Sequence, residues 1–496
     1  MNHRPEPLVT TPQGVVRGLR GADAHTFLDI PYAAPPVGAG RFASPRPHEP
    51  WDGVRDATVP GPNAPQSERK LGSVDMAPYF GAGWSRGEDY LTVNVFAPPT
   101  ASGGLPVMVF VHGGGFVAGS TRSAMYDGST FARDGVVLVT LNYRLGIAGF
   151  LDLPGAPANR GLLDVVAALH WVRDNIAAFG GDPRQVTLFG QSAGATIVGG
   201  VLATPAAQGL FRRAIVQSGS GLGAFSPEQA ARVTHAAAEA LGVAPDVDAF
   251  AEVSDERLVE AASRLAGTDL RTETHFDPLI GLSPFSLVLD TQPAASVAAG
   301  LGADVDLLVG TNSEEAHLYL VPVGKFDTTT AADVDDVAVR SHPHPAQLVE
   351  TYRSTRPEAS AGELRSALMG DALFGAGSRA LAGAHAAHPR STTYAYEFAW
   401  RSQALDGQLG ATHTVELPFV FDLTRLAALN GPTALLGPAQ PPADLSTRVH
   451  EAWIRFARTG DPGWDPYDSE RRTTMRIDAD WTQVHDPRRR ERQVWS

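Results

Sequence analysis

The chain of 496 residues contains no cysteine, and this absence removes several classes of site. Disulfides, cysteine–zinc sites and cysteine nucleophiles are excluded, because each of them needs a thiol or a thiolate. The fold therefore does not depend on an oxidising compartment.

The sequence also lacks a long apolar run and an excess of positive charge. No run of about 18 apolar residues occurs, and Met1 to Pro7 contains no apolar segment of the kind that signal peptides carry. The formal net charge is -14, and we interpret the short basic run Arg488 to Arg490 as part of a solvated tail. We expect a cytoplasmic protein with no nucleic-acid or membrane partner; export by another route is the alternative.

What is present is the composition of a globular protein with a large core, 43% apolar and 19% charged. Strands and helices alternate along the chain, which predicts an α/β fold with a large, mostly parallel sheet flanked by helices. Buried strands are expected over 106–111, 135–141, 186–189, 213–217, 305–310 and 392–400, and helices over 162–179, 227–241 and 445–459. Residues 8–20, broken at Gly14, predict a small N-terminal antiparallel sheet.

A strand, a tight turn and a helix follow one another around Ser192. The apolar run Val186 to Phe189 leads into Gly-Gln-Ser-Ala-Gly at 190–194, and small residues that suit a helix continue to Leu202. The two glycines leave room at a strained turn, so the Ser192 hydroxyl would stand above the end of the strand. The pattern predicts that Ser192 is a nucleophile, although three fixed letters in a chain with 51 glycines also match by chance.

Three successive glycines follow the apolar run 106–111, in His112 to Phe116. A flexible turn is the simpler interpretation, but a turn needs one glycine and seldom three. We therefore favour a loop whose N–H groups face a developing negative charge. Two irregular stretches, 53–87 and 223–302, are expected to form walls around this site; disorder is the alternative for the first.

A serine hydroxyl needs a histidine to accept its proton and a carboxylate to orient that histidine. His413 stands out among the histidines after Ser192, because it follows a predicted strand and a loop that contains glycine. Glu314 and Glu315 both follow the strand 305–310, and the residues alone do not choose between them. The histidines weighed against His413 are His235, His275, His317, His342, His344, His385, His388, His450 and His485.

The chain resembles the type B carboxylesterases, the cholinesterase and para-nitrobenzyl esterase family, through motifs that extend over almost its whole length in family order. The matching stretches are 30–38, 88–95, 112–116, 142–146, 179–183, 190–194, 217–219, 310–315, 413–421 and 456–462. The resemblance implies an α/β-hydrolase fold in one domain over residues 1–496. It also implies a carboxylic ester hydrolase that acts through an acyl-enzyme on small to medium, fairly apolar esters.

The resemblance further implies a role for each site residue. Ser192 takes the nucleophile position, Glu315 the acid position and His413 the base position. The backbone N–H groups of Gly114, Gly115 and Ala193 take the oxyanion positions, and no metal or organic cofactor is needed. Ser218 resembles a serine beside the glutamate, and two pairs resemble structural ion pairs of the family: Arg41 with Glu88, and Arg144 with Asp164.

Two departures from the family concern the loop 53–87 and the choice between Glu314 and Glu315. Tyr90 stands where many members carry the first cysteine of a disulfide, so the loop 53–87 is not cross-linked by a disulfide. Ala316 replaces a glycine that is usual after the glutamate.

Two other functions remain as alternatives. A non-catalytic binding module on the same fold would require the loss of one of the three catalytic side chains. Acyl transfer, or cleavage of a thioester, lactone, carbamate or amide, would use the same residues, so the motifs do not separate it from ester hydrolysis. The partner is a small-molecule ester, and the oligomeric state, monomer or dimer, is left open.

Overall fold

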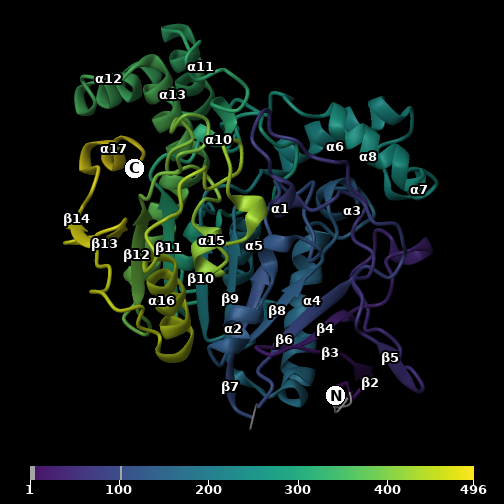
Figure 1. Ribbon diagram of the computed structural model, residues 1–496. Helices are drawn as coiled ribbons and strands as arrows, with labels where there is room; N and C mark the ends of the chain where they lie inside the picture. The colour runs from purple at the N-terminus through teal and green to yellow at the C-terminus, as the bar shows by residue number, and fades with distance from the viewer. Residues whose placement is uncertain (1–5, 101–102) are drawn as a thin grey trace.

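A computed structural model describes residues 6–100 and 103–496 (Figure 1). Met1 to Pro5, on which the expectation of no signal peptide partly depends, lie outside the described residues. The strands are β1 Leu8–Thr11, β2 Gly14–Arg17, β3 Leu19–Arg20, β4 His25–Pro31, β5 Val54–Asp56, β6 Thr92–Ala97, β7 Leu105–Val111, β8 Val137–Leu141, β9 Gly181–Gln191, β10 Arg213–Gln217, β11 Asp306–Asn312, β12 Thr393–Phe398, β13 Thr473–Ile477 and β14 Thr482–His485.

Helices cover the sheet and its carboxyl end. They are α1 Ala77–Phe80, α2 Ser129–Arg133, α3 Gly146–Phe150, α4 Arg160–Asn175, α5 Ala193–Leu202, α6 Pro227–Leu241, α7 Val247–Ala251, α8 Asp255–Arg264, α9 Pro293–Ala298, α10 His317–Leu320, α11 Ala331–Ser341, α12 Pro345–Thr355, α13 Ala361–Gly370, α14 Ala376–Ala386, α15 Leu417–Val420, α16 Leu445–Thr459 and α17 Arg489–Val494. A π-helical turn, Asp371–Gly375, joins α13 to α14.

Eleven strands form one sheet in the order β14-β13-β12-β11-β10-β9-β7-β8-β6-β4-β3. From β13 to β8 every neighbouring pair is parallel, and the antiparallel pairs lie toward the two edges. A second sheet, in the order β1-β2-β5, is mixed, because β5 pairs with β2 in parallel. The expected small N-terminal sheet is therefore present, but it is not purely antiparallel.

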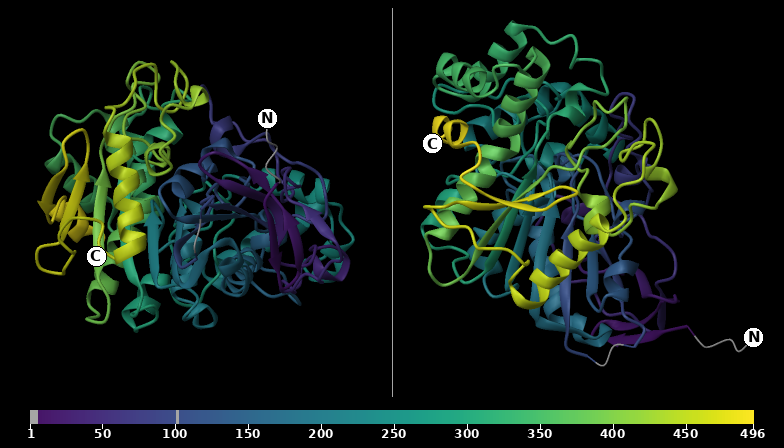
Figure 2. Two further views of the ribbon diagram at one scale, coloured as in Figure 1. Left: turned by 60° about the horizontal axis from the view of Figure 1, so that its bottom comes forward. Right: turned by 60° about the vertical axis from the view of Figure 1, so that its left-hand side comes forward.

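The side chains of β7 show how the core is divided. Val107, Val109 and Val111 point to one face, into a cluster that includes residues of α4 and α5. Met108 and Phe110 point to the other face, into a cluster with Trp453 of α16. Successive side chains of a strand alternate between faces, so a continuous apolar run requires cover on both sides. Figure 2 shows α16, drawn in yellow, along one face of the sheet.

The start of a helix could be predicted from the sequence where a side chain caps it. Ser226 accepts a hydrogen bond from Gln229 N–H and begins α6, which has Pro227 at its first position. Asn159 precedes α4 but caps nothing; it adopts a left-handed conformation, and its side-chain amide pairs with the backbone of Val288. Within residues 6–100 and 103–496 there is no helix long and apolar enough to cross a membrane.

Candidate active site

Ser192 lies at a sharp turn between β9 and α5. Its φ is +58°, a left-handed value that a residue with a side chain rarely adopts. A Cβ on Gly194 would lie 2.1 Å from the carbonyl oxygen of Val111, and one on Gly190 would lie 2.8 Å from Gly194. Only residues without side chains fit at these two positions, so the turn closes against the end of β7 and presents the serine hydroxyl.

Three side chains from distant segments form one hydrogen-bonded series. Ser192 Oγ lies 2.7 Å from His413 Nε2, and His413 Nδ1 lies 2.6 Å from Glu315 Oε2. The His413 and Glu315 side chains are only 2% and 3% exposed. With the carboxylate accepting from Nδ1–H, Nε2 carries the lone pair that can accept the serine proton; the Gln191 side-chain amide also lies 3.3 Å from this nitrogen. This arrangement can generate a nucleophilic alkoxide at Ser192.

Glu315 is held by two further donors. Ser218 Oγ donates to Glu315 Oε1 at 2.6 Å, and the backbone N–H of Asn312 donates to the same oxygen at 2.7 Å. Glu314 instead forms an ion pair with Arg401, and its other oxygen accepts from Ala411 N–H at 2.8 Å. Of the two neighbours that the residues alone did not separate, the structure therefore places Glu315 against the histidine.

His413 is fixed by its backbone and by an aromatic ring. Its N–H donates to the Glu315 carbonyl at 3.2 Å. The Phe374 ring, from the π-helical turn, stacks on the imidazole at 4.3 Å between centroids and 11° between planes. In the described part of the chain, no other histidine is hydrogen-bonded to Ser192. His317, for example, pairs with the carbonyl of Gln408 at 2.8 Å.

The triple-glycine loop lies beside the serine. Gly114 and Gly115 have φ of +112° and +65°. Within the described residues, nothing accepts a hydrogen bond from either N–H, and Ala193 N–H is free of an intrahelical acceptor because it begins α5. All three residues line the pocket that contains Ser192. Their N–H groups are available to an anion that forms there.

This pocket is about 650 Å³ in volume, the space at its mouth included. Its walls are largely apolar and come from the two irregular stretches and from the segments around α10 and the π-helical turn. Among the described residues of its lining, Arg69 is the one side chain with a permanent charge. The apolar and aromatic members of the lining are Leu71, Met76, Tyr79, Phe80, Phe116, Leu279, Leu282, Leu318, Tyr319, Leu373 and Phe374.

A side-chain amide connects two distant parts of the irregular stretch 53–87. Asn63 is fully buried, and its side chain accepts from Ser85 N–H at 2.6 Å and donates to the Gly83 carbonyl at 2.8 Å. Gln66 also holds the stretch to the segment that follows the triple-glycine loop, because its side chain pairs with both the N–H and the carbonyl of Gly119. Side-chain amides therefore tie together a loop that has no disulfide.

Two ionisable residues near the site were not found from the sequence. Glu416 is fully buried, and its carboxylate accepts from Asn312 Nδ2 at 2.7 Å and from Gln217 Nε2 at 3.3 Å. Burial raises the pKa of Glu416 to about 7. An acid in the apolar run after His413 was the available signal. No sequence signal pointed to Arg69, because the irregular loop that carries it has no periodicity.

One of the two expected ion pairs is absent. Arg144 and Asp164 form a fully buried pair at 2.7 Å. Arg41, expected to pair with Glu88, pairs instead with Asp255 of α8 and donates to the carbonyl of Val253. The correct partner belongs to the stretch 223–302, whose path could not be predicted from the sequence.

Comparison with known proteins identifies similar chains over nearly the full length. The model of the Carboxylesterase family matches residues 5–495. The para-nitrobenzyl esterase of Bacillus subtilis (strain 168) is 37% identical, with 98% of each chain covered. The phenmedipham hydrolase of Pseudarthrobacter oxydans is 35% identical, with 92% of this chain and 91% of the relative covered.

Solved structures agree with this comparison. A para-nitrobenzyl (PNB) esterase structure superposes with a TM-score of 0.83 at 36% identity and covers 99% of both chains. A carboxylesterase of Geobacillus stearothermophilus superposes with a TM-score of 0.85 at 34% identity, covering 99% of this chain and 100% of its own.

Proposed function

The chain belongs to the carboxylesterase family and is a serine carboxylic-ester hydrolase with the α/β-hydrolase fold, and from this premise we propose roles for its site residues. Ser192 is the nucleophile, His413 the general base and Glu315 the acid that orients the histidine. The observation that supports this assignment is the continuous series of hydrogen bonds from Glu315 through His413 to Ser192, at 2.6 and 2.7 Å.

The reaction then follows from the geometry. His413 Nε2 takes the proton of Ser192 as Oγ attacks the ester carbonyl, and the N–H groups of Gly114, Gly115 and Ala193 hold the resulting oxyanion. The C–O bond to the alcohol breaks, and the alcohol leaves with the proton from His413. Water then attacks the acyl-serine by the reverse path and releases the acid. Glu315 keeps the imidazole in the tautomer that this sequence of proton transfers requires.

We propose small to medium, fairly apolar esters as the substrates. The pocket around Ser192 is lined mainly by aromatic and aliphatic side chains, which favours a desolvated apolar group next to the reacting carbonyl. Hydrolysis rates measured on a series of esters of rising acyl length would define the limit. A preference that rises without limit toward long chains would contradict a small or medium substrate.

We also propose that residues 1–496 form one domain and that the protein is cytoplasmic. The continuity of the large sheet from β3, near the N-terminus, to β14, near the C-terminus, supports one domain. The lack of cysteine is compatible with a reducing compartment. Limited proteolysis that releases a stable, folded fragment would contradict the first proposal. Recovery of the native protein in the exported fraction of its source cells would contradict the second.

Covalent labelling tests the assignment of the nucleophile. A fluorophosphonate probe is expected to label the wild-type protein stoichiometrically and to leave the Ser192→Ala variant unlabelled, with the two proteins unfolding at the same temperature. Labelling of the variant, or hydrolysis by it at the wild-type rate, would remove Ser192 from the mechanism.

A further inference from the structure

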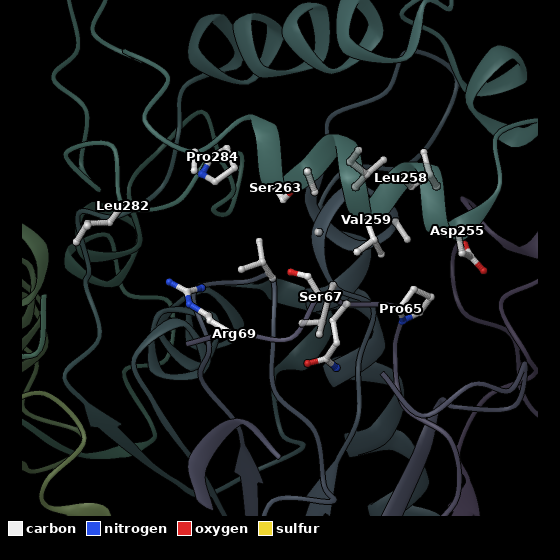
Figure 3. A pocket seen from close by; sticks show the side chains of 17 residues that line it. Pro65, Ser67, Arg69, Asp255, Leu258, Val259, Ser263, Leu282 and Pro284 are labelled. Atoms are coloured by element: carbon white, nitrogen blue, oxygen red, sulfur yellow. The ribbon is translucent and has the colours of Figure 1, made fainter. Parts of the chain in front are cut away.

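A second cavity adjoins the pocket of Ser192. It measures about 800 Å³ with the space at its mouth and lies between α8 and the segment 65–69. Figure 3 shows Arg69 and Leu282 at one end of it and Asp255 at the other, with Leu258 and Val259 of α8 along its roof. Arg69 and Leu282 also line the pocket of Ser192, so they stand where the two spaces meet.

Among the described residues, the guanidinium of Arg69 has no carboxylate partner. It donates one hydrogen bond, from NH1 to the Gly114 carbonyl at 3.1 Å, and it lies over the Phe80 ring at 5.6 Å from the centroid. In the part of the chain that the structure describes, no Asp or Glu oxygen lies within 4.0 Å of it. Asp255, the acid that lines the second cavity, is paired with Arg41.

This cation is also largely removed from water. Burial lowers the pKa of Arg69, with the nearby Tyr319 and Tyr79 acting in the opposite direction. A guanidinium stays charged in proteins, so the free-energy penalty of its burial persists until an anion approaches. A carboxylate can accept two parallel N–H bonds from it, which is the strongest of the common charge-assisted contacts.

One peptide group sets the distance between the Arg69 guanidinium and the oxyanion. The Gly114 carbonyl, which accepts from Arg69, and the Gly115 N–H, assigned to the oxyanion, belong to the same trans peptide. The two groups of a trans peptide point in opposite directions, and Arg69 NH1 lies to the Gly115 side of the carbonyl, 2.9 Å from where a Cβ on Gly115 would stand. The guanidinium and the oxyanion are therefore roughly 6–8 Å apart. A carboxylate on Arg69 would therefore stand about three to five bonds from the scissile carbonyl.

We propose that Arg69 selects esters whose acyl part carries a carboxylate, that is, half-esters of dicarboxylic acids of about four to six carbons. The inference rests on the proposed function of Ser192 and its oxyanion donors. It adds an anionic substituent to a substrate that is otherwise apolar. The second cavity, lined beyond Arg69 mainly by apolar side chains such as Leu145, Ile147 and Leu258, accommodates an alkyl branch on the same acyl group.

Two substrates with the same alcohol test the proposal. The 4-nitrophenyl butyrate ester is neutral, and the corresponding monoglutarate ester carries the carboxylate. The wild-type protein is expected to show the higher kcat/KM on the monoglutarate. Arg69→Met, which keeps an unbranched apolar chain, is expected to lower kcat/KM for the monoglutarate by about 10- to 100-fold and for the butyrate by less than about threefold. Arg69→Lys should retain an intermediate preference.

Arg86→Met is the matched control. Arg86 belongs to the same irregular stretch, but it is exposed and forms an ion pair with Glu256, so the ratio of the two kcat/KM values should not change. An equal loss on both esters in Arg69→Met would mean that Arg69 only holds the Gly114 carbonyl, and it would overturn the proposal. That outcome would leave the assignment of Ser192 intact, whereas a wild-type protein that the fluorophosphonate does not label would overturn the assignment itself.

A measurement on the wild-type protein covers the case in which Arg69→Met does not fold. Free glutarate is expected to inhibit hydrolysis of the butyrate ester competitively, at a concentration at least tenfold below that at which butyrate inhibits. Equal inhibition by the two acids, together with no preference for the monoglutarate ester, would overturn the proposal.

Discussion

The two sides of the catalytic pocket differ in how their backbone is held. On the sheet side, Ser192, Glu315 and His413 follow the carboxyl ends of parallel strands and are almost fully buried. On the loop side, the stretch 53–87 has little regular structure and is held by single side-chain contacts such as those of Asn63. The reacting groups therefore stand on the part with cooperative backbone pairing, and one wall of the pocket stands on the part without it.

Strand register explains the precision of the sheet side. Gln191, at the end of β9, is opposite Gln217 of β10, and Gln217 is opposite Gly310 of β11. The segments that follow these strands start at the same edge and at nearly the same height, so short side chains are enough to connect them. Among the described residues of the loop side, strand pairing with a register is limited to β5 at the start of the stretch. The rest of the stretch can therefore vary with the substrate without disturbing the chemistry.

The largest effect is expected on the sheet side. His413→Ala removes the base, and kcat/KM should fall by about 10⁵-fold or more while the unfolding temperature changes little. His317→Ala, a buried histidine hydrogen-bonded elsewhere, is the matched control and should keep activity within about tenfold. A comparable loss in His317→Ala would mean that the sheet side is sensitive to any buried change rather than to the loss of the base.

The neighbouring glutamates provide the next test. Glu315→Gln cannot hold the imidazole in the required tautomer, so kcat should fall by about 10³- to 10⁴-fold. Glu314→Gln alters a partly exposed ion pair with Arg401 and should change kcat by less than about threefold. Steady-state kinetics on both variants show which glutamate orients His413. A greater loss of kcat in Glu314→Gln would reverse the assignment.

Glu416 makes the stability of the sheet side depend on pH. A folded-state pKa of about 7, above the ordinary 4.5, means that the folded protein keeps a proton that the unfolded chain has released. The free energy of unfolding therefore falls as pH rises from about 4.5 to about 7, by roughly 3 kcal/mol from this group. Urea unfolding from pH 5 to 8 should show this extra fall in the wild-type protein relative to Glu416→Gln. Parallel pH profiles of the two proteins would contradict it.

The smallest effect is expected on the loop side. Asn63→Ala leaves Ser85 N–H and the Gly83 carbonyl without their partners, at a local cost of about 1–3 kcal/mol. Cleavage of the stretch 53–87 by a protease should become faster and KM should rise severalfold, with kcat retained. Glu68→Gln, an exposed change in the same stretch, is the control. A fall in kcat without a change in cleavage would show that the two sides are not separable.

The sequence predicted those parts of the molecule that follow local rules. The bounds of α6 and α16 and of β10 agree with the expected ranges, because caps and apolar periodicity define them. The turn at Ser192 carries a strained conformation between two glycines that admit no side chain. Such a turn has a sequence signature.

What the sequence did not predict depends on contacts between distant segments. The partner of Arg41 and the environments of Glu416 and Arg69 are set by chain segments that meet only in the folded protein. The helices α11 to α14 were also not predicted. The choice between Glu314 and Glu315 came from family resemblance rather than from the residues, since either can follow the strand.

The long separation between Ser192 and His413 also has a consequence during translation. They lie 221 residues apart, so at about 5–20 residues per second a ribosome needs roughly 10 to 45 s to add the histidine after the serine. Until then the nascent polypeptide carries the hydroxyl without the base that activates it. With the roles proposed for Ser192 and His413, we therefore expect newly made chains to stay inert toward esters until most of the protein has been synthesised.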